Sequence, residues 1–245
     1  VVPQAGVNSS EAAVALERAC QLMLAYVASV SDEGLRRNYL SKVAINREIT
    51  LIWSRQAAAQ GRSLAPFTER ESGSNLHDQL QRMLSIGVRL SQQRNPEALP
   101  RFILDEFVEL CGAERALLLL ADDAGSELRL VLTNDLDETA GSQAQALAQP
   151  LLAQVRQQRL ARVIAQLGDA PPDDLAVLHL RSALAVPLLA QGKLLGILYG
   201  DMRHIFGCFT TADLDLLTVL ANQAAAALEN ANWTRTLEQR VAERT

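Results

Sequence analysis

Cysteine and histidine, the residue types that most often carry catalysis or bind metals, are few and scattered in this chain. The three cysteines, Cys20, Cys111 and Cys208, form no Cys-x-x-Cys pair and have no histidine cluster near them. This arrangement argues against a structural zinc site and a disulfide scaffold, and it predicts a reducing, cytoplasmic location. The sequence also lacks a Gly-rich phosphate loop, His-Glu-x-x-His and Gly-x-Ser-x-Gly, so we expect no enzyme and no bound metal.

One histidine allows a more specific interpretation. His77 lies beside Asp78 in a helical pattern, where a phosphate-accepting histidine of a kinase could lie. The flanking residues, LHDQLQ, do not resemble that motif. We therefore interpret His77 as an ordinary surface histidine.

The composition is that of an ordinary globular chain. The 245 residues are 49% hydrophobic and 21% charged, and the net charge is −5. This supports a core of one or two domains and argues against nucleic-acid binding. The basic residues Arg36, Arg37, Lys42 and Arg47 are interrupted by acidic ones, so we expect a solvated helix face there. No apolar run approaches the ~18 residues that a membrane span needs.

The first part of the chain predicts helices. Apolar residues recur at helical spacing in four segments: 9–30, 35–59, 76–95 and 97–110. The first two predict a helical hairpin within residues 1–60, which could end an upstream helical domain or pack on the domain that follows. Residues 61–75 are rich in Gly, Ser, Pro and charge and predict a linker. Gly112 predicts the end of the fourth helix.

After Gly112 the apolar pattern becomes typical of strands. Strands are expected at 115–123, 127–135, 160–167, 182–191 and 193–201. Helices are expected at 142–158 and, after a loop, before Leu180. Gln191-Gly192 predicts a tight hairpin turn, because Gly readily adopts a positive φ. Pro187 inside a strand predicts an edge or a bulge.

The chain closes with a long helical pattern. Thr210 or Thr211 can cap this helix, with Asp213 in its first turn. From there to Thr245 nothing interrupts the pattern, and at ~1.5 Å per residue the helix spans ~50 Å. Residues 231–245 are therefore expected to project as a coiled-coil signalling helix. The chain starts without Met and stops within this pattern, so we expect a piece of a longer protein.

A set of motifs near the end of the chain resembles the GAF domain. The motifs are Val186-Pro187-Leu188, Leu195 to Leu198 followed by Asp201, Phe209-Thr210-x-x-Asp213, and the Ala-rich run from Ala221 to Ala231. The resemblance covers about residues 76–230 and implies an α+β sensor domain. Its expected fold is a central antiparallel sheet of five or six strands with helices on one face. Residues 136–181 would roof the other face and leave a cavity.

In the GAF family this cavity binds small molecules such as cyclic nucleotides, bilins or haem. A bilin would need a cysteine beside a histidine in the roof, and Cys208 is not placed so. Haem would need an axial ligand, for which His179 is the candidate near the roof. The cyclic-nucleotide signature Asn-Lys-Phe-Asp-Glu cannot be assembled here. The cofactor therefore stays unassigned.

If a ligand binds, polar side chains near the cavity should contact it. The candidates are Arg129, Thr133, His179, Arg181, Ser182 and Tyr199. Arg181 would suit an anionic ligand through bidentate hydrogen bonds. The alternative is that Arg181 forms a structural ion pair with Asp173, Asp174 or Asp201. The family also includes methionine-sulfoxide reductases, which would require Cys111 and Cys208 to be close and exposed.

The last helix predicts how a signal could leave the domain. Two apolar stripes run along it, and one of them could form a homodimer seam whose residues include Leu220, Ala227, Thr234, Leu237 and Val241. The resemblance implies a non-catalytic regulatory sensor that relays its signal to a fused histidine kinase or nucleotide cyclase. The alternative is a ligand-free structural dimerisation module with a filled core.

Overall fold

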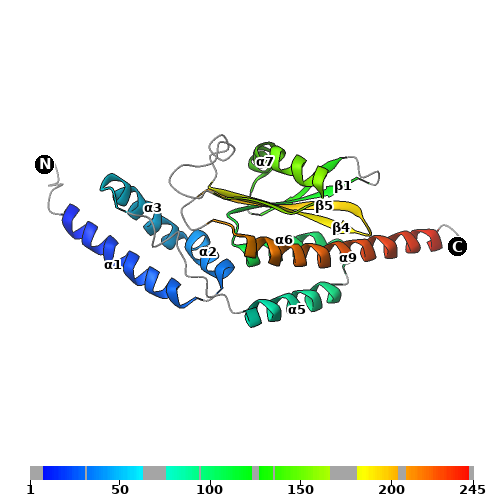
Figure 1. Ribbon diagram of the computed structural model, residues 1–245, viewed down its shortest axis with the longest axis horizontal. Coiled ribbons are helices and arrows are strands. Elements are labelled where there is room, and N and C mark those ends of the chain that lie inside the picture. Colours follow the sequence, from blue (N-terminus) through cyan, green and yellow to red (C-terminus); the bar gives the residue numbers. More distant parts are fainter. Residues whose placement is uncertain are drawn as a thin grey trace.

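The computed structural model describes residues 8–30, 32–62, 76–93, 95–122, 127–134, 136–165, 181–203 and 208–242. Its central element is a five-stranded antiparallel sheet flanked by helices (Figure 1). The strands are β1 Arg115–Ala121, β2 Leu128–Thr133, β3 Arg162–Ala165, β4 Ser182–Ala190 and β5 Lys193–Met202. They are ordered β2-β1-β5-β4-β3 across the sheet. The expected α+β class with a central antiparallel sheet is confirmed.

The β4–β5 hairpin follows its sequence signals. Gln191 and Gly192 have φ values of 48° and 78°, and two consecutive residues with positive φ are typical of a tight hairpin turn. Pro187 lies beyond the residues of β4 that pair with β3 and beside a register shift between Leu188 and Leu189. The missing N–H of Pro187 therefore interrupts no pairing with β3. Of the two predicted alternatives, an edge or a bulge, Pro187 takes the first: it lies at a local edge of β4, and the register shift follows one residue later.

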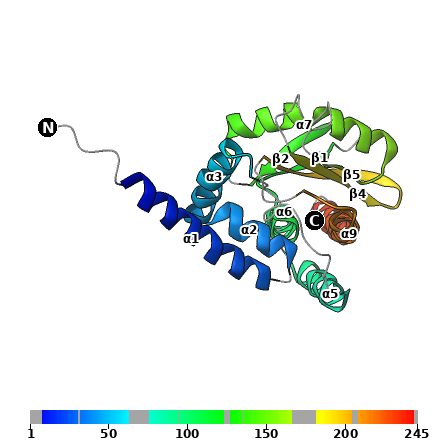
Figure 2. The ribbon, with the colours of Figure 1, turned by 60° about the vertical axis from the view of Figure 1, so that its left-hand side comes forward.

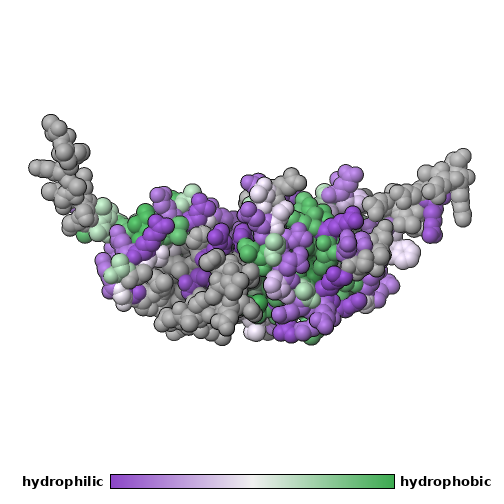
Figure 3. Space-filling view, turned by 90° about the horizontal axis from the view of Figure 1, so that it is seen from above, coloured by the Kyte–Doolittle hydropathy of each residue, from purple (hydrophilic) through white to green (hydrophobic). Residues whose placement is uncertain are grey.

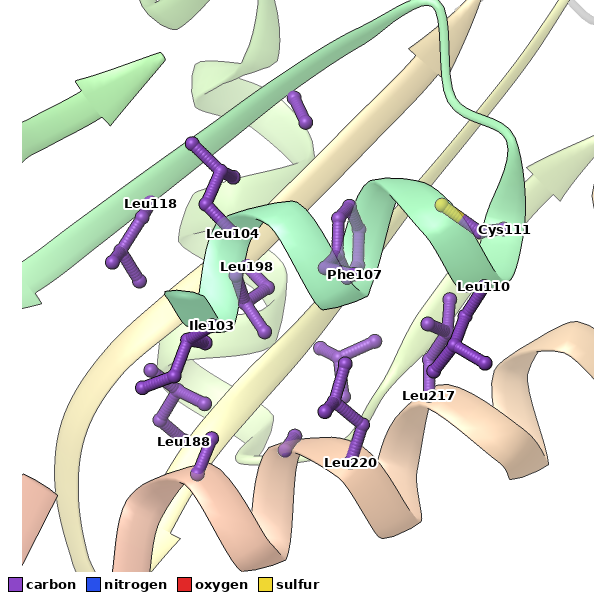
Figure 4. Packing of buried hydrophobic residues seen from close by; sticks show 14 of the residues in the cluster. Ile103, Leu104, Phe107, Leu110, Cys111, Leu118, Leu188, Leu198, Leu217 and Leu220 are labelled. Atoms are coloured by element: carbon purple, nitrogen blue, oxygen red, sulfur yellow. The ribbon is translucent and has the colours of Figure 1, made fainter. Parts of the chain in front are cut away.

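One face of the sheet is covered by helices in two layers. These helices are α5 Leu76–Gln92, α6 Leu99–Cys111 and α9 Thr211–Ala242. Helices α6 and α9 lie against the sheet, and α5 packs on their outer side (Figure 2). Ile103 and Phe107 of α6 pack in one cluster with Leu118 and Leu198 of the sheet and Leu220 of α9 (Figure 4). This cluster forms the main core. Burial of each side chain of this size contributes about 1.5–3 kcal/mol to the stability of the fold.

The ends of α6 and α9 match the residues that predicted them. Gly112 has a φ of 64° and its N–H donates to the carbonyl of Val108, which ends α6 in the left-handed conformation. The Thr210 N–H donates to Asp213 Oδ2 at 2.7 Å, and the Asp213 N–H donates to Thr210 Oγ1 at 3.3 Å. This reciprocal pair is a capping box, and it fixes the start of α9.

Helix α7, Glu138–Gln158, covers the opposite face of the sheet (Figure 1). It begins four residues earlier than predicted, because the carboxylate of Asp137 accepts a hydrogen bond from the Ala140 N–H at 2.7 Å. Its inner side packs in a second cluster with Leu117 and Ile197, while the described surface on this side mixes hydrophilic residues with hydrophobic patches (Figure 3). The helix is thus part of the expected roof at 136–181. The expected loop and short helix before Leu180 lie outside the described residues.

Residues 8–62 form three helices, where two were expected. They are α1 Asn8–Ser29, α2 Glu33–Lys42 and α3 Ala44–Ala59. The predicted helix 35–59 is interrupted at Val43, whose ψ of 110° is extended rather than helical. The break lets α3 pack on α1, where Trp53 joins a small cluster with Cys20 and Met23. Almost all of the expected linker lies outside the part of the chain that the structure describes.

The expectation of a solvated basic helix face is wrong for α2. Arg36 and Arg37 are only 7% and 1% exposed, because α2 packs against α6. Lys42 and Arg47 are exposed, as expected. The alternation of acidic and basic residues indicated a polar helix face, but it could not indicate that another part of the chain covers this face.

Candidate functional site

Polar side chains gather at one end of the sheet face that α7 covers. Arg115, the first residue of β1, lies directly opposite Asp201 of β5. Tyr199 lies two residues before Asp201 and therefore on the same face. The neighbouring residues of this face, such as Leu117 and Ala183, are buried and apolar. Arg115, Tyr199 and Asp201 form a polar cluster at the end of a mostly apolar surface.

The cluster is held together by short hydrogen bonds. Arg115 donates from Nε to Asp201 Oδ1 at 2.8 Å and from Nη2 to Oδ2 at 2.7 Å. The Tyr199 hydroxyl donates to the same Oδ2 at 2.9 Å. Asp201 and Tyr199 are fully buried, whereas the Arg115 side chain is 14% exposed. A bidentate pair between arginine and carboxylate is among the strongest and most directional hydrogen-bonded contacts in proteins.

Burial controls the protonation of this cluster. It raises the pKa of the Tyr199 phenol above its ordinary value, and the charge of Asp201 raises it further. Burial also raises the pKa of Asp201, although hydrogen bonds from Arg115 and Tyr199 oppose the rise. For Arg115, burial lowers the pKa but the contact with Asp201 outweighs it, so that pKa is raised. Near neutral pH Tyr199 is therefore a neutral hydrogen-bond donor and Arg115 a cation, which suits binding better than proton transfer.

Two of the residues expected to bind a ligand have clear structural contacts instead. Thr133 lies on the same face as Tyr199, and its hydroxyl donates to the carbonyl of Leu136 at 3.0 Å. The Ser182 hydroxyl donates to the Ile164 carbonyl at 3.0 Å and accepts from the Phe209 N–H at 3.0 Å. Ser182 thus joins β3 to the residues before α9. Both hydroxyls help to fix the backbone around the cluster.

Arg129 lies on the other face of the sheet. It pairs with Leu120, which packs against the core below α6, and its side chain is exposed. The pairing of β1 with β2 shifts register between Leu118 and Leu119, so Thr133 and Arg129 occupy opposite faces despite their even spacing. The structure therefore does not bring Arg129 together with Tyr199. His179 lies outside the described residues.

Arg181 lies at the same end of the sheet as the cluster. Its backbone N–H donates to the Met202 carbonyl at 2.9 Å, next to Asp201. The Nε atom of Arg181 is buried and has no hydrogen-bond partner within the described part of the chain. The proposed ion pair with Asp201 is not formed, because Arg115 and Tyr199 occupy that carboxylate. Asp173 and Asp174 lie outside the described residues.

A hollow of about 530 Å³ lies between α7 and the β1–β2 hairpin. It is lined by Leu119, Glu127, Leu128, Gln149, Leu152, Ala153, Arg156 and Gln157. This volume is within the range of small-molecule sites. None of the expected ligand-contact residues that the structure describes lines it: Thr133 and Tyr199 lie toward the opposite end of the sheet, and Arg129 lies on its other face.

The cysteines do not form a reactive pair in this arrangement. Cys111 is 1% exposed, and burial raises the pKa of its thiol to about 12. A thiol in this state contains almost no nucleophilic thiolate near neutral pH. Cys208 is half-buried, and neither cysteine forms a disulfide. The exposed pair that a sulfoxide reductase would require is therefore not formed.

The residues expected along the dimer seam fall into three groups. Leu220 is buried in the core of this chain, and Ala227 packs against the same core. Thr234 is exposed, and its hydroxyl donates to the Asn230 carbonyl at 3.0 Å. The side chains of Leu237 and Val241 lie outside the described set. The helix is 32 residues long, or about 48 Å, and its C-terminal part extends beyond the sheet (Figure 1).

Sequence reasoning missed Arg115 as part of the cluster. Arg115 stands at the charged boundary of an apolar run, where a strand end is the natural interpretation. Its role depends on the register that places it opposite Asp201. That register is set by the pairing of the whole sheet, so no local sequence pattern predicts it.

An antiparallel sheet with α7 on one face and α5, α6 and α9 on the other defines an α+β domain. The part of the chain that the structure describes contains no grouping of His, Cys, Asp and Glu that could hold a metal ion. Residues 93–229 match the family model of the GAF domain. The chain belongs to this family, and GAF domains are regulatory sensor modules of signalling proteins.

The fold agrees with that of a solved structure, and a second is reported for comparison. The GAF domain of a phosphoenolpyruvate-protein phosphotransferase from Coxiella burnetii is 21% identical, with a TM-score of 0.51, and the match covers 66% of this chain and 99% of that one. Free methionine-R-sulfoxide reductase from Neisseria meningitidis is 18% identical, with a TM-score of 0.46, covering 69% and 99%. No curated protein matches the chain. None of the described helices is long and apolar enough to cross a membrane.

Proposed function

We propose that this chain is a non-catalytic cytoplasmic sensor module. It binds a small molecule at the polar end of the α7-covered face and relays the signal through α5 and α9 to a fused output domain, such as a histidine kinase or nucleotide cyclase. The observation that carries this proposal is the cluster of Arg115, Tyr199 and Asp201, at the same end of the sheet as Arg181, whose buried Nε has no hydrogen-bond partner among the described residues. Core packing alone does not require such a costly group of buried polar atoms.

The cluster favours an anionic ligand. Arg115 uses Nε and Nη2 for Asp201, which leaves its Nη1 free of that carboxylate. Arg181 adds a second guanidinium at the same end of the sheet. Two guanidinium groups at one end of the sheet, of which only Arg115 pairs with the buried Asp201, favour an additional negative group, such as a carboxylate or phosphate.

The route out of the domain starts beneath the same strands. Helix α9 packs against β4, and α5 packs against α9, where Gly87 lies close to Gln223. A change at the end of β4 or β5 would therefore reach α9 directly. Leu84 and Val88 of α5 are 71% and 54% exposed and lie one helical turn apart. Such an apolar pair beside α9 suits contact with a second copy of the chain.

A structural dimerisation module is the second candidate, and one observation favours it. The middle of the α7-covered face is filled by Leu117, Leu152, Val155 and Ile197, all of which are at most 3% exposed. A face packed in this way needs no ligand for stability. In this case Arg115 and Asp201 would only hold β1 against β5.

Native mass spectrometry of the purified chain, over a range of protein concentrations, separates these proposals. A dimer that carries extra mass supports the sensor and gives the mass of the ligand. The variant Arg181→Met should lose this mass, whereas Arg129→Met, on the other face, should keep it. A dimer without extra mass supports the structural module. A monomer at every concentration would contradict relay through paired helices.

A further inference from the structure

The sheet domain carries a contact surface that is occupied by a helix from outside the region that matches the GAF family. This surface consists of the C-terminal end of α6, residues Cys208 and Phe209, and the first turn of α9. Its occupant is α2 of the N-terminal helices. The contact involves a buried charge and close backbone packing, and each can be followed atom by atom.

The buried charge is Arg37. Its guanidinium donates to Asp213 Oδ1 at 3.1 Å and to Asp213 Oδ2 at 3.0 Å. It also donates to the Cys111 carbonyl at 3.0 Å and to the Cys208 carbonyl at 2.9 Å, and its Nε lies 2.9 Å from Glu33. Arg37 therefore joins the end of α6, the residues before α9 and the first turn of α9. The Arg37 side chain is only 1% exposed.

The close packing involves two glycines. A Cβ atom on Gly34 would lie 2.1 Å from the Leu110 carbonyl oxygen, and a Cβ on Gly112 would lie 2.4 Å from Cβ of Arg37. Both distances are far below van der Waals contact, so only glycine fits at these positions. Asn38 donates to the carbonyls of Val108 and Glu109 at 3.2 and 3.3 Å. Side chains of α2 thus add a second donor to the Val108 carbonyl, which already accepts from Gly112, and bind the Glu109 and Cys111 carbonyls in the last turn of α6.

Asp213 connects this contact to the signalling helix. The same carboxylate that binds Arg37 accepts the Thr210 N–H and forms the capping box of α9. The N-terminal helices have their own small core around Trp53 and Leu40, so they can act as a unit. A displacement of that unit would pull the Arg37 guanidinium away from the residue that fixes the start of α9.

We propose that α2 is a regulatory contact that couples the N-terminal helices to the first turn of α9, giving this sensor an input separate from its ligand site. The N-terminal helices hold α9 in place while α2 is docked, and they release its first turn when α2 leaves. This input does not require a small molecule at Arg115. The experiments that test it are therefore independent of the ligand proposal.

Hydrogen exchange of the whole chain, followed by mass spectrometry, tests the coupling in Arg37→Met. We expect exchange to rise about tenfold or more at 108–113 and 209–216, because local opening no longer has to break the Arg37–Asp213 contact. The sheet amides of β1 and β5 should keep their protection. The matched control is Arg47→Met, since Arg47 is an exposed arginine of α3 and should leave all these segments unchanged.

Two outcomes would overturn the proposal. If exchange rises only in α1–α3 while residues 209–216 stay protected, α2 is a passive anchor. If it rises equally across the sheet, Arg37 is a general stabiliser rather than a coupling residue. Should Arg37→Met fail to fold, Gly34→Ala tests the same contact by steric displacement, with Leu35→Ala on the exposed side of α2 as its control.

A double-variant comparison tests whether the coupling passes through the carboxylate of Asp213. Asp213→Asn should raise exchange at 209–216, and the combination with Arg37→Met should add little, because both variants break the same contact. Fully additive effects would show that Arg37 and Asp213 act independently and would overturn the proposed route.

Discussion

Two arginines, Arg37 and Arg115, hold together parts of the chain that are distant in sequence. Arg37 joins α2 to α6 and α9, and Arg115 joins β1 to β5. Each faces a buried carboxylate, Asp213 or Asp201. In such a pair the loss of one member costs more than the pair itself contributes, because the remaining charge stays buried.

The variant Arg115→Met should show this cost directly. It leaves Asp201 with only Tyr199 as a side-chain donor, so we expect the free energy of unfolding to fall by about 3–5 kcal/mol near pH 7. Urea denaturation measures the change. Arg129→Met, in the neighbouring strand but exposed, should change it by about 0.5 kcal/mol or less. A similar small change for both variants would show that Asp201 is better hydrated than its burial indicates.

Stability should also fall in alkaline solution. Burial raises the pKa of Cys111 from an ordinary 9.0 to about 12 and that of Cys20 to about 11, and it raises that of Tyr199 as well. Because these groups lose protons more easily when unfolded, their contribution is complete below pH 9 and is lost as pH rises toward the folded pKa values. Each group that ionises only on unfolding adds a slope of up to about 1.4 kcal/mol per pH unit.

The variant Cys111→Ala provides the check on this pH dependence. It should be less stable at pH 7, because it leaves a small cavity. Between pH 9 and 11 its free energy of unfolding should nevertheless fall less steeply with pH than that of the wild type. The difference in slope should correspond to about one proton. Urea midpoints measured at several pH values give both slopes, and parallel slopes would contradict a buried, protonated Cys111 thiol.

At the scale of elements, local sequence signals predicted what local interactions decide. The β4–β5 turn follows from Gln191-Gly192, and the start of α9 from Thr210 and Asp213. The bulge that turns Arg129 to the other face carries no Gly or Pro to mark it, because the pairing of β1 with β2 creates it. Local sequence could not predict the burial of Arg37 either, since this burial depends on contact between segments far apart in the chain.

Packing between α6 and β5 depends on a residue without a side chain. A Cβ on Gly200 would lie 3.0 Å from the ring of Phe107 and 3.0 Å from Cβ of Ala113. Gly200→Ala should therefore push α6 away from the sheet and lower the free energy of unfolding by about 1–3 kcal/mol. Lys193→Ala, at the exposed start of the same strand, is the control. Thermal unfolding of the two variants measures the difference, and equal melting temperatures would show that Phe107 moves aside freely.

At the scale of the whole molecule, α9 connects every part that could send or receive a signal. Asp213 in its first turn binds Arg37 of α2, its middle packs under β4, and its last part extends past the sheet (Figure 1). The side chains of Asn232, Trp233 and Thr234 are exposed there. The described residues of the domain leave Trp233 of this projecting helix 61% exposed, so a second copy of the chain is the natural partner in our proposal.

The dimer we propose can be tested on α5, which lies beside α9. Leu84→Asp places a charge in the exposed apolar pair with Val88, and burying that charge between two copies should weaken the dimer by about 2 kcal/mol or more, or about 30-fold in Kd. Leu22→Asp is the matched control, because Leu22 is 66% exposed on α1, away from this helix pair. Native mass spectrometry of a dilution series measures both. Dimer loss with Leu22→Asp but not with Leu84→Asp would move the interface to the N-terminal helices, and α9 would then lack a paired helix through which to act.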